Sequence, residues 1–265
     1  MRKFLALLPI ASLVIFTFYI QAKPTSLLLN TNSLASGIPN TNVAEKSETN
    51  SRNTANVAVE HVYELINFNS LSKPNLLCFT KAYEAYKTLI SNDLVENHLL
   101  TIVDFSLSST VERLWVIDML NHEVVLQSLV AHGIKSGDEF ATRFSNTKNS
   151  FQSSLGVYLT GEVYNGRNGL SLRLDGLNAG YNNLARERGV VIHGANYVSE
   201  SYIERNGRLG RSQGCPAVST EINAKLIELI KDKSVLFIYH PHLESATASK
   251  SIKKLNLQGF VKRNI

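Results

Sequence analysis

The sequence predicts an α+β fold that is mainly β, with a small helical segment ahead of the strands. Between residues 57 and 98, apolar residues recur at three- and four-residue spacing, which is the period of an amphipathic helix. From residue 100 to 242, short runs rich in β-formers alternate with Gly/Asn turns, as strands do. Regular helices do not separate these runs, which argues against an alternating βαβ architecture.

The helical segment, residues 57–99, divides into two predicted helices. The apolar face of the first consists of Val62, Leu65 and Ile66. Pro74 fits the first turn of the second helix, whose apolar stripe consists of Leu76, Leu77, Phe79, Tyr83, Tyr86, Leu89 and Ile90. Cys78 lies inside this stripe, so we expect it to be a small buried hydrophobe rather than a reactive thiol.

The region 100–242 is predicted to hold the strands. The turn Asn121-His122 separates two β-rich runs and makes them a hairpin. The runs lie at 100–105, 114–120, 124–130, 156–160, 170–174, 189–193 and 235–239. One helix interrupts them. Ser219 or Thr220 is its predicted N-cap, and its apolar stripe consists of Ile222, Leu226, Ile227, Leu229 and Ile230.

The first 22 residues predict a signal peptide or a membrane anchor. Arg2 and Lys3 precede an apolar run from residue 4 to 20, which is the pattern of a secretory signal. The run is at the short end of what spans a bilayer, so cleavage and anchoring both stay open. We therefore expect an exported protein of the periplasm or cell envelope, tethered to the membrane if the signal is not cleaved.

Two further segments flank the predicted domain. More than half of residues 30–56 are Asn, Ser or Thr and none is aromatic. Such a composition cannot bury enough apolar surface to fold, so residues 23–56 are predicted to be a flexible linker. The tail, residues 243–265, is predicted to be solvated. Its basic residues are Lys250, Lys253, Lys254, Lys262 and Arg263.

Composition narrows the function classes. The net charge of +5 and the pI near 9.1 suit an anionic cell envelope. Lys and Arg are scattered and no zinc-finger, RNP or helix-turn-helix signature is present, so nucleic-acid binding is not expected. The two cysteines, Cys78 and Cys215, are too few for a disulfide framework, although an oxidising compartment would permit them to pair.

The densest cluster of reactive residues is Gly210-Arg-Ser-Gln-Gly-Cys-Pro216, with His193-Gly194 upstream at the end of a strand-like run. A thiol needs a base or a nearby positive charge to become a nucleophile at neutral pH, and histidine is the usual base. Cys215 also precedes the predicted helix, whose dipole favours a thiolate. Gly214 has no side chain to block a substrate carbonyl, and N–H groups around it can stabilise an oxyanion.

This pattern resembles the catalytic domain of the L,D-transpeptidase (YkuD-like) family, in which His-Gly is followed about twenty residues later by Ser-x-Gly-Cys. The hairpin at 113–130 resembles the family's early strands, and Ser153-Ser-Leu-Gly-Val-Tyr158 resembles its Thr-Pro-x-Gly-x-Phe/Tyr segment. Gly-Arg-Ser-x-Gly-Cys-Pro-Ala-Val, Val-Ala-His-Gly at 130–133 and Phe-Ser-Asn at 144–146 are similar to a murein L,D-transpeptidase branch. The resemblance covers roughly residues 100–240 and implies a β-sandwich-like catalytic domain.

The resemblance also implies the site. Its catalytic residues would be Cys215, His193, Ser212 and Gly214, and its substrate-binding residues would be Gly194 and Arg211. No metal or cofactor is implied. The sequence departs from the family at two positions. Gln213 stands where the family commonly has histidine, and Ala217 stands where many members have arginine. Arg211 is the candidate to replace the missing charge.

The reaction implied by the resemblance acts on peptidoglycan stem peptides. Cys215 would attack a tetrapeptide stem, release D-alanine and form a thioester, which an amine of a second stem would resolve into a cross-link. Water in place of the amine would make the protein an L,D-carboxypeptidase or another murein-trimming hydrolase. A carbapenem is the implied acylating agent. Because of the two departures, an inactive murein-binding module stays an alternative.

Rival motifs are weaker. Residues 210–214 read G-x-S-x-G, a serine-nucleophile motif, but 204–209 is predicted to be a polar loop instead of the strand that this motif requires. Ser145 and Ser70 each begin an S-x-x-K match, and no K-T-G follows. A zinc site at His240 and His242 would need a close ligand pair on a helix or a C-x-x-C, which the sequence lacks.

Overall fold

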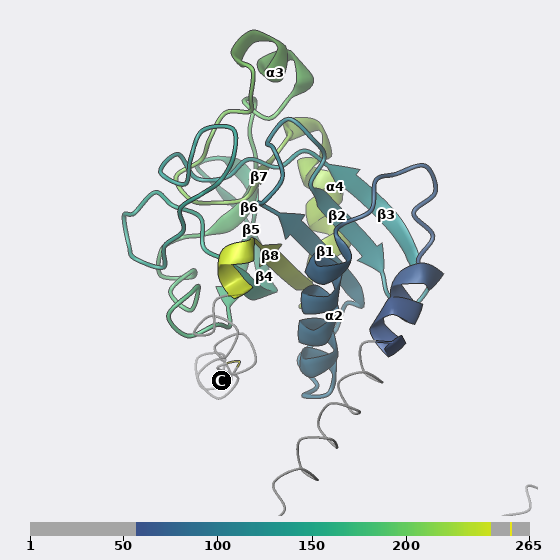
Figure 1. The fold of residues 1–265 in the computed structure, drawn as a ribbon. Coiled ribbons are helices and arrows are strands. Elements are labelled where there is room, and N and C mark those ends of the chain that lie inside the picture. Colours follow the sequence, from purple (N-terminus) through teal and green to yellow (C-terminus); the bar gives the residue numbers. More distant parts are fainter. Residues whose placement is uncertain (1–56, 245–254, 256–265) are drawn as a thin grey trace, which may run out of the picture. The chain divides into compact units, whose positions relative to one another are not determined.

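The computed structural model describes residues 57–244 and residue 255. The predicted fold class is confirmed, because a mixed sheet dominates this part of the chain and helices cover it (Figure 1). The predicted signal or anchor, the linker and most of the basic tail lie outside the described residues. Among the described residues, no helix has both the length and the apolar character needed to cross a membrane.

The sheet has eight strands within the described residues, in the order β3-β2-β1-β8-β4-β5-β6-β7. The strands are β1 (Leu99–Asp104), β2 (Leu114–Asp118), β3 (Glu123–Ser128), β4 (Gly156–Gly166), β5 (Gly169–Gly176), β6 (Val191–Gly194), β7 (Ala217–Val218) and β8 (Val235–Tyr239). The β1–β8 and β6–β7 pairs are parallel and the other pairs are antiparallel. The predicted hairpin is confirmed as β2–β3, with His122 at positive φ in its turn.

Helices pack against the strands. Residues 57–65 are helical, α2 (Leu76–Ile90) packs on β1 and β8, and α4 (Thr220–Ile230) packs on β5 and β6. A short α3 (Glu200–Asn206) and the 3₁₀ turn η1 (Pro241–Glu244) complete the described elements. One hydrophobic cluster extends from Val59 to β8, so the helical residues and the strands share a core.

Several local predictions need correction. Leu65 is 52% exposed, and Leu76 and Leu77 are also exposed, so none of the three lies on the buried face. Pro74 precedes α2, and the helix is capped by the Asn75 side chain, which accepts a hydrogen bond from the Leu77 N–H. Asparagine at this position satisfies a helix N–H that would otherwise lack a partner, which explains why the helix begins after Asn75.

Two elements were not predicted. The segment 204–209 was expected to be a polar loop, but α3 reaches Asn206 and buries none of its residues. The sequence features that indicate α3 lie at its two ends. The Ser199 hydroxyl accepts a hydrogen bond from the Tyr202 N–H at the start, and Gly207 adopts the left-handed conformation at the end. The strand β7 is only two residues long, which is too short for a period-two pattern to indicate it.

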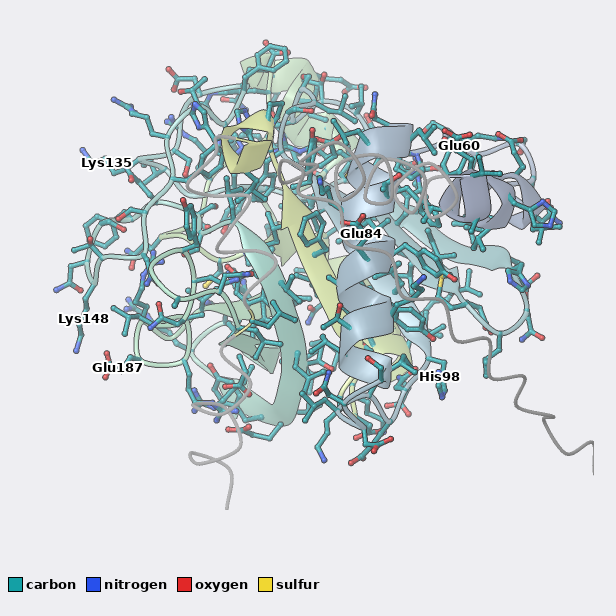
Figure 2. The ribbon with its side chains drawn as sticks, turned by 60° about the horizontal axis from the view of Figure 1, so that its bottom comes forward. Glu60, Glu84, His98, Lys135, Lys148 and Glu187 are labelled. Carbon is teal, nitrogen blue, oxygen red and sulfur yellow. The ribbon has the colours of Figure 1, made fainter. Side chains whose placement is uncertain are left out.

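A long connection joins β3 to β4 and runs beside the sheet. It contains Lys135 and Lys148, which lie to one side of α2 and its Glu84 in Figure 2. Ser136 organises this connection, because its carbonyl accepts from the Thr142 and Arg143 N–H groups and its hydroxyl accepts from the Ser153 N–H. The same connection supplies one wall of the candidate site.

Candidate active site

The candidate catalytic loop, residues 210–216 and called the catalytic loop below, is fixed by main-chain pairing. The Ser212 N–H donates to the His132 carbonyl over 3.0 Å, and the Ile134 N–H donates to the Ser212 carbonyl over 2.8 Å. Immediately after the loop, Ala217 exchanges hydrogen bonds with Ala131 and pairs with His193 of β6. The loop is therefore held on both sides of Cys215.

The Ser212 hydroxyl closes the turn that carries Cys215. It donates to the Cys215 carbonyl over 2.6 Å and accepts from the Gly214 N–H over 3.0 Å. A hydroxyl that bridges two main-chain groups in this way holds a loop in one conformation. The structure thus gives Ser212 a positioning geometry, and the Gly214 N–H that we considered for an oxyanion is already bonded to the protein.

Gly214 is needed for close packing of the loop. Its φ is +122°, and a Cβ on it would lie 2.8 Å from the Gln152 carbonyl oxygen. A Cβ on Gly133 would in turn lie 2.9 Å from the Gly214 Cα. Any side chain at either glycine would push these segments apart, so the β3–β4 connection is packed tightly against the catalytic loop.

Cys215 lies in the loop before β7, with its side chain against the start of β6. Its Sγ donates to the Gly189 carbonyl over 3.7 Å, and the Val191 backbone is hydrogen-bonded to it. The side chain is half-buried. Val191 is two residues before His193 on β6, so the thiol contacts the strand that carries the imidazole.

His193 has a defined ring orientation. Its side chain is buried, and Nδ1 lies 2.9 Å from the Gly194 carbonyl oxygen. A carbonyl only accepts, so Nδ1 carries the proton of the neutral ring and Nε2 is left as the basic nitrogen. Gly194 itself packs on α4, because a Cβ there would lie 3.1 Å from the Asn223 Cβ.

The surroundings of Cys215 shift the pKa of its thiol in opposite directions. Burial raises the pKa of the thiol, while the Val191 backbone and the Arg188 guanidinium lower it, and burial wins. Free Cys215 therefore favours the thiol form and needs a base to become a thiolate. The helix dipole adds little, since β7 separates Cys215 from α4 and the dipole effect falls off within the first turn.

Three other positions were considered for the site from the sequence, and the structure gives each of them different surroundings. Arg211 pairs with Asp138, and its Nη1 also donates to the Gly137 carbonyl over 3.0 Å. Gln213 is exposed, and Ala217 is fully buried between strands. Arg211 therefore has a structural partner, and the position where many family members carry arginine has no room for one in this chain.

Arg188 is a site residue that the sequence analysis missed. Its guanidinium binds the segment 145–154 and lies close to Gly214, since its Nη2 would be 3.4 Å from a Cβ placed there. The segment before β6 is rich in turns and carries no motif around this arginine. Because its partners are more than thirty residues away along the chain, only the tertiary fold reveals the contact.

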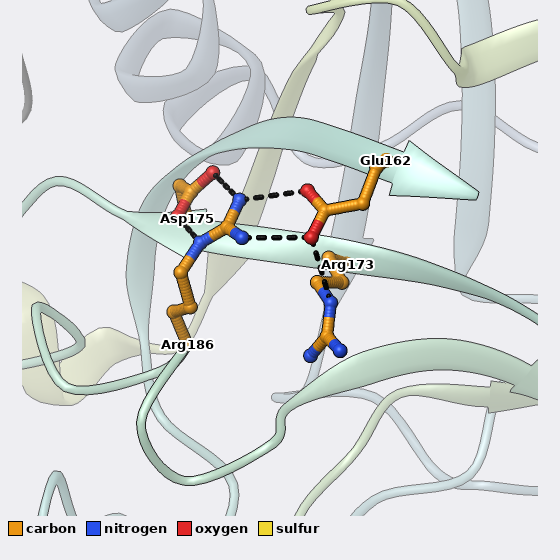
Figure 3. Close-up of polar contacts among 4 residues, drawn as sticks. All are labelled: Glu162, Arg173, Asp175 and Arg186. Carbon is orange, nitrogen blue, oxygen red and sulfur yellow. Dashed lines mark hydrogen bonds and ion pairs between the residues drawn. The ribbon is translucent and has the colours of Figure 1, made fainter. Parts of the chain in front are cut away.

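An ion network anchors the segment that carries Arg188 (Figure 3). Arg186 donates to Asp175 through Nε over 2.5 Å and through Nη2 over 2.7 Å, and also contacts both oxygens of Glu162. Arg173 donates to the same Glu162 over 2.8 Å. Gly161 leaves space for the guanidinium, because a Cβ there would lie 2.9 Å from Arg186 Nη2. The network ties residues 184–189 to β4 and β5.

The rival sites find little geometric support. Ser212 uses its hydroxyl in the loop, and Ser145 Oγ accepts from the Thr147 N–H. His240 and His242 pack against Phe144 in tilted and edge-on arrangements, with ring centroids 4.8 and 5.7 Å from that of Phe144. Within residues 57–244, no group of three His, Cys, Asp or Glu side chains is arranged to hold a metal ion.

Known proteins allow the family to be assigned. The family model described as the L,D-transpeptidase catalytic domain matches residues 70–239, which is more than half of the chain. No curated protein sequence matches as a relative.

Among solved structures, an L,D-transpeptidase from Mycobacterium smegmatis shares 14% identity over 54% of this chain and 59% of its own, with a TM-score of 0.32. An L,D-transpeptidase in complex with imipenem shares 13% identity over 54% of this chain and 59% of its own, with a TM-score of 0.33. An L,D-transpeptidase from Stackebrandtia nassauensis shares 10% identity over 70% of this chain and 90% of its own, with a TM-score of 0.33. The chain thus spans about three fifths of the first two structures. On the family-model match, the chain belongs to the L,D-transpeptidase catalytic domain family.

Proposed function

We propose that this protein is a peptidoglycan L,D-transpeptidase in which Cys215 is the nucleophile and His193 is the base. Members of the family are acyltransferases that act on peptidoglycan stem peptides. The observation that carries the residue assignment is the arrangement at β6. The Cys215 thiol meets the first residues of this strand, and the bonded Nδ1 of His193 leaves Nε2 to take its proton.

The reaction has two acyl-transfer steps. His193 accepts the thiol proton, and the Cys215 sulfur attacks the carbonyl carbon between the third residue and the terminal D-alanine of a tetrapeptide stem. The amide bond breaks, His193 returns the proton to the departing D-alanine amine, and a thioester remains. The amine of a second stem then attacks the thioester, the C–S bond breaks, and a new amide forms with release of the thiol.

The Cys215 N–H is a main-chain donor that the loop can direct at transition-state charge. The Gly214 N–H is held by Ser212, whereas the Cys215 N–H donates to no protein acceptor within the described part of the chain. An N–H on the nucleophilic residue is a common oxyanion donor. Ser212 then serves the reaction indirectly, by keeping this turn closed.

The test is incubation of the full-length protein with defined tetrapeptide muropeptides, with products and enzyme followed by mass spectrometry. We expect D-alanine release, an acyl adduct on Cys215 and a cross-linked dimer. Cys215→Ala abolishes all three, while Ser212→Ala retains part of the turnover. D-alanine release without a dimer would favour the carboxypeptidase, and binding without an adduct would favour the inactive module.

The base is tested by acylation with a carbapenem across pH. General-base help is worth about 10²–10⁴-fold, so His193→Ala should slow adduct formation on Cys215 by that factor without unfolding the domain. The exposed His61 supplies the control, because His61→Ala should leave the rate unchanged. An unaltered rate and pH midpoint in His193→Ala would show that another group activates the thiol.

We also propose that the chain is exported, by cleaved signal or by an N-terminal anchor. The motive is the charged start followed by the apolar run from residue 4 to 20, together with a family substrate that belongs to the cell wall. Fractionation of cells that express the full chain, with intact mass of the recovered protein, tests both parts. Recovery of the full-length mass from the cytoplasm alone would contradict export.

A further inference from the structure

Arg188 is a charged residue that the proposed reaction leaves without a role. It lies three residues before Val191, and its side chain is only half-exposed. Within residues 57–244, it forms no ion pair with a carboxylate. Removing a cation from water costs free energy unless other groups compensate, so the surroundings of this guanidinium require an explanation.

Its hydrogen bonds all go to one segment. Nη1 donates to the Ser145 carbonyl over 2.7 Å and also to the Ser154 hydroxyl, while Nη2 donates to the Gln152 carbonyl over 2.6 Å and to the Ser150 hydroxyl over 3.3 Å. The Gln152 carbonyl is the same atom that lies against Gly214. Arg188 therefore clamps residues 145–154 directly behind the catalytic loop.

This geometry excludes Arg188 from binding a substrate carboxylate through two parallel hydrogen bonds. Bidentate recognition of a carboxylate requires guanidinium N–H groups that are not already used. Each Nη of Arg188 has two hydrogens, and each makes two hydrogen bonds to the protein. Binding a stem carboxylate in that way would release the clamp, so what Arg188 offers the site is its position and its charge.

We propose that Arg188 is the positioning residue of this active site, holding residues 145–154 against Gly214 while its fixed positive charge stabilises the Cys215 thiolate. The proposal rests on the proposed role of Cys215. Ala217, where many family members carry arginine, is fully buried and supplies no charge to the site. Arg211, committed to Asp138, does not fill that role.

The other groups that face Cys215 do not supply a permanent cation. Tyr158 of β4 and Tyr197, which follows β6, both interact with it. Burial raises the pKa of both phenols, so they are neutral at pH 7. His193 of β6 is the proton acceptor. Burial lowers the pKa of Arg188, but an arginine stays protonated at neutral pH.

The experiment follows alkylation of Cys215 by iodoacetamide in the full-length protein from pH 6 to 10, read by peptide mass. Arg188→Met removes the charge and should raise the pH midpoint by about one unit, which is about tenfold slower labelling below it. Arg188→Lys keeps the charge but loses the guanidinium hydrogen bonds to residues 145–154. Its midpoint should therefore stay near wild type while muropeptide turnover falls. Arg205→Met, at an exposed position of α3, removes an equal charge and should leave the midpoint unchanged.

An unchanged midpoint in folded Arg188→Met overturns the proposal, and so does an equal shift in Arg205→Met. If Arg188→Met fails to fold by circular dichroism, Arg188→Gln, which retains amide donors without charge, takes its place with the same expected shift. Alkylation needs no substrate. A shifted midpoint in a protein that never turns over muropeptides would therefore sink the proposed function and leave the role of Arg188 standing.

Discussion

The two cysteines differ in the exposure of their side chains. Cys78 is fully buried in α2, and burial raises the pKa of its thiol well above the ordinary value, whereas Cys215 is half-buried. Both are free. At pH 8 we expect iodoacetamide to label Cys215 first and Cys78 only after unfolding in urea, as read by peptide mass. Equal rates, or a Cys78–Cys215 disulfide in the active protein, would contradict the placement of Cys78 in the core.

His132 predicts a loss of stability in acid. It is buried, its Nδ1 accepts from Arg113, and burial, followed by the charge of Arg113, lowers its pKa from 6.5 to about 4. Between these values the unfolded chain binds the proton and the folded chain does not. Stability is therefore complete above pH 6.5 and falls as the pH drops toward 4. The loss is roughly 3 kcal/mol, at about 1.36 kcal/mol per unit.

Urea unfolding at pH 7 and pH 4.5 checks this. His132→Gln should flatten the pH dependence, because glutamine accepts a hydrogen bond but does not titrate, whereas His61→Gln at an exposed position should change nothing. Part of the slope should persist, since burial also lowers the pKa of His240 to about 4. A wild-type protein that is equally stable at both pH values would refute the assignment.

Single-residue chemistry explains what the sequence revealed of the site. Cys215 stands out as a candidate because the chain has two cysteines and the other lies in an apolar stripe. His193 stands out among seven histidines because a glycine follows it at the end of a strand-like run. Arg188 does not, because its role depends on carbonyls at Ser145 and Gln152 that only folding brings to it. Arg211 was the natural guess for the missing charge, being near in sequence, but its partner Asp138 is set by the β3–β4 connection.

At the scale of elements, the network in Figure 3 should control the segment before β6 more than overall stability. Arg186 is 39% exposed, and such pairs contribute little to unfolding free energy. Its contacts with Asp175 and Glu162 nevertheless hold residues 184–189. Arg186→Met should speed amide hydrogen exchange there and slow Cys215 alkylation a few-fold, with little change in melting temperature.

Arg173→Met is the matched control. It removes the same charge from the same network, but Arg173 contacts Glu162 and the Tyr164 ring, and among the residues that the structure describes its guanidinium forms no hydrogen bond or ion pair with residues 184–189. Exchange in that segment should therefore stay close to wild type. If both variants loosen it equally, net charge rather than the Arg186 anchor would govern the segment.

Helices and strands could be predicted from the sequence where burial of one face gives their apolar residues a regular spacing. The strands β1, β2, β3 and β8 and helix α4 follow apolar patterns and lie where these patterns indicated. The exposed α3 has no such pattern, since no residue of it is buried. Strand order was beyond reach, because β8 pairs between β1 and β4 although more than 65 residues separate it from either in sequence.

At the scale of the molecule, the core begins before the region that the family model matches. That match begins at residue 70, yet the buried side chains of the main cluster include four from the preceding stretch, namely Val59, Tyr63, Ile66 and Phe68. Tyr63 also donates to the Pro74 carbonyl over 2.7 Å and lies 5.1 Å from the Phe79 ring. Asn67 pairs with the outer edge of β3 through the His122 carbonyl and the Val124 N–H.

We therefore expect two truncations to behave differently. A chain that starts at residue 57 should melt close to the full-length protein, because the described core is retained. A chain that starts at residue 70 loses four buried side chains worth roughly 1.5–3 kcal/mol each, against a total stability of about 5–15 kcal/mol, and uncovers the edge of β3. The combined loss is about 6–12 kcal/mol, so its melting temperature should fall by roughly 12–48 °C, at about 2–4 °C per kcal/mol. Scanning calorimetry of both chains decides the matter. Equal melting temperatures would mean that residues 57–69 lie on the core without supporting it.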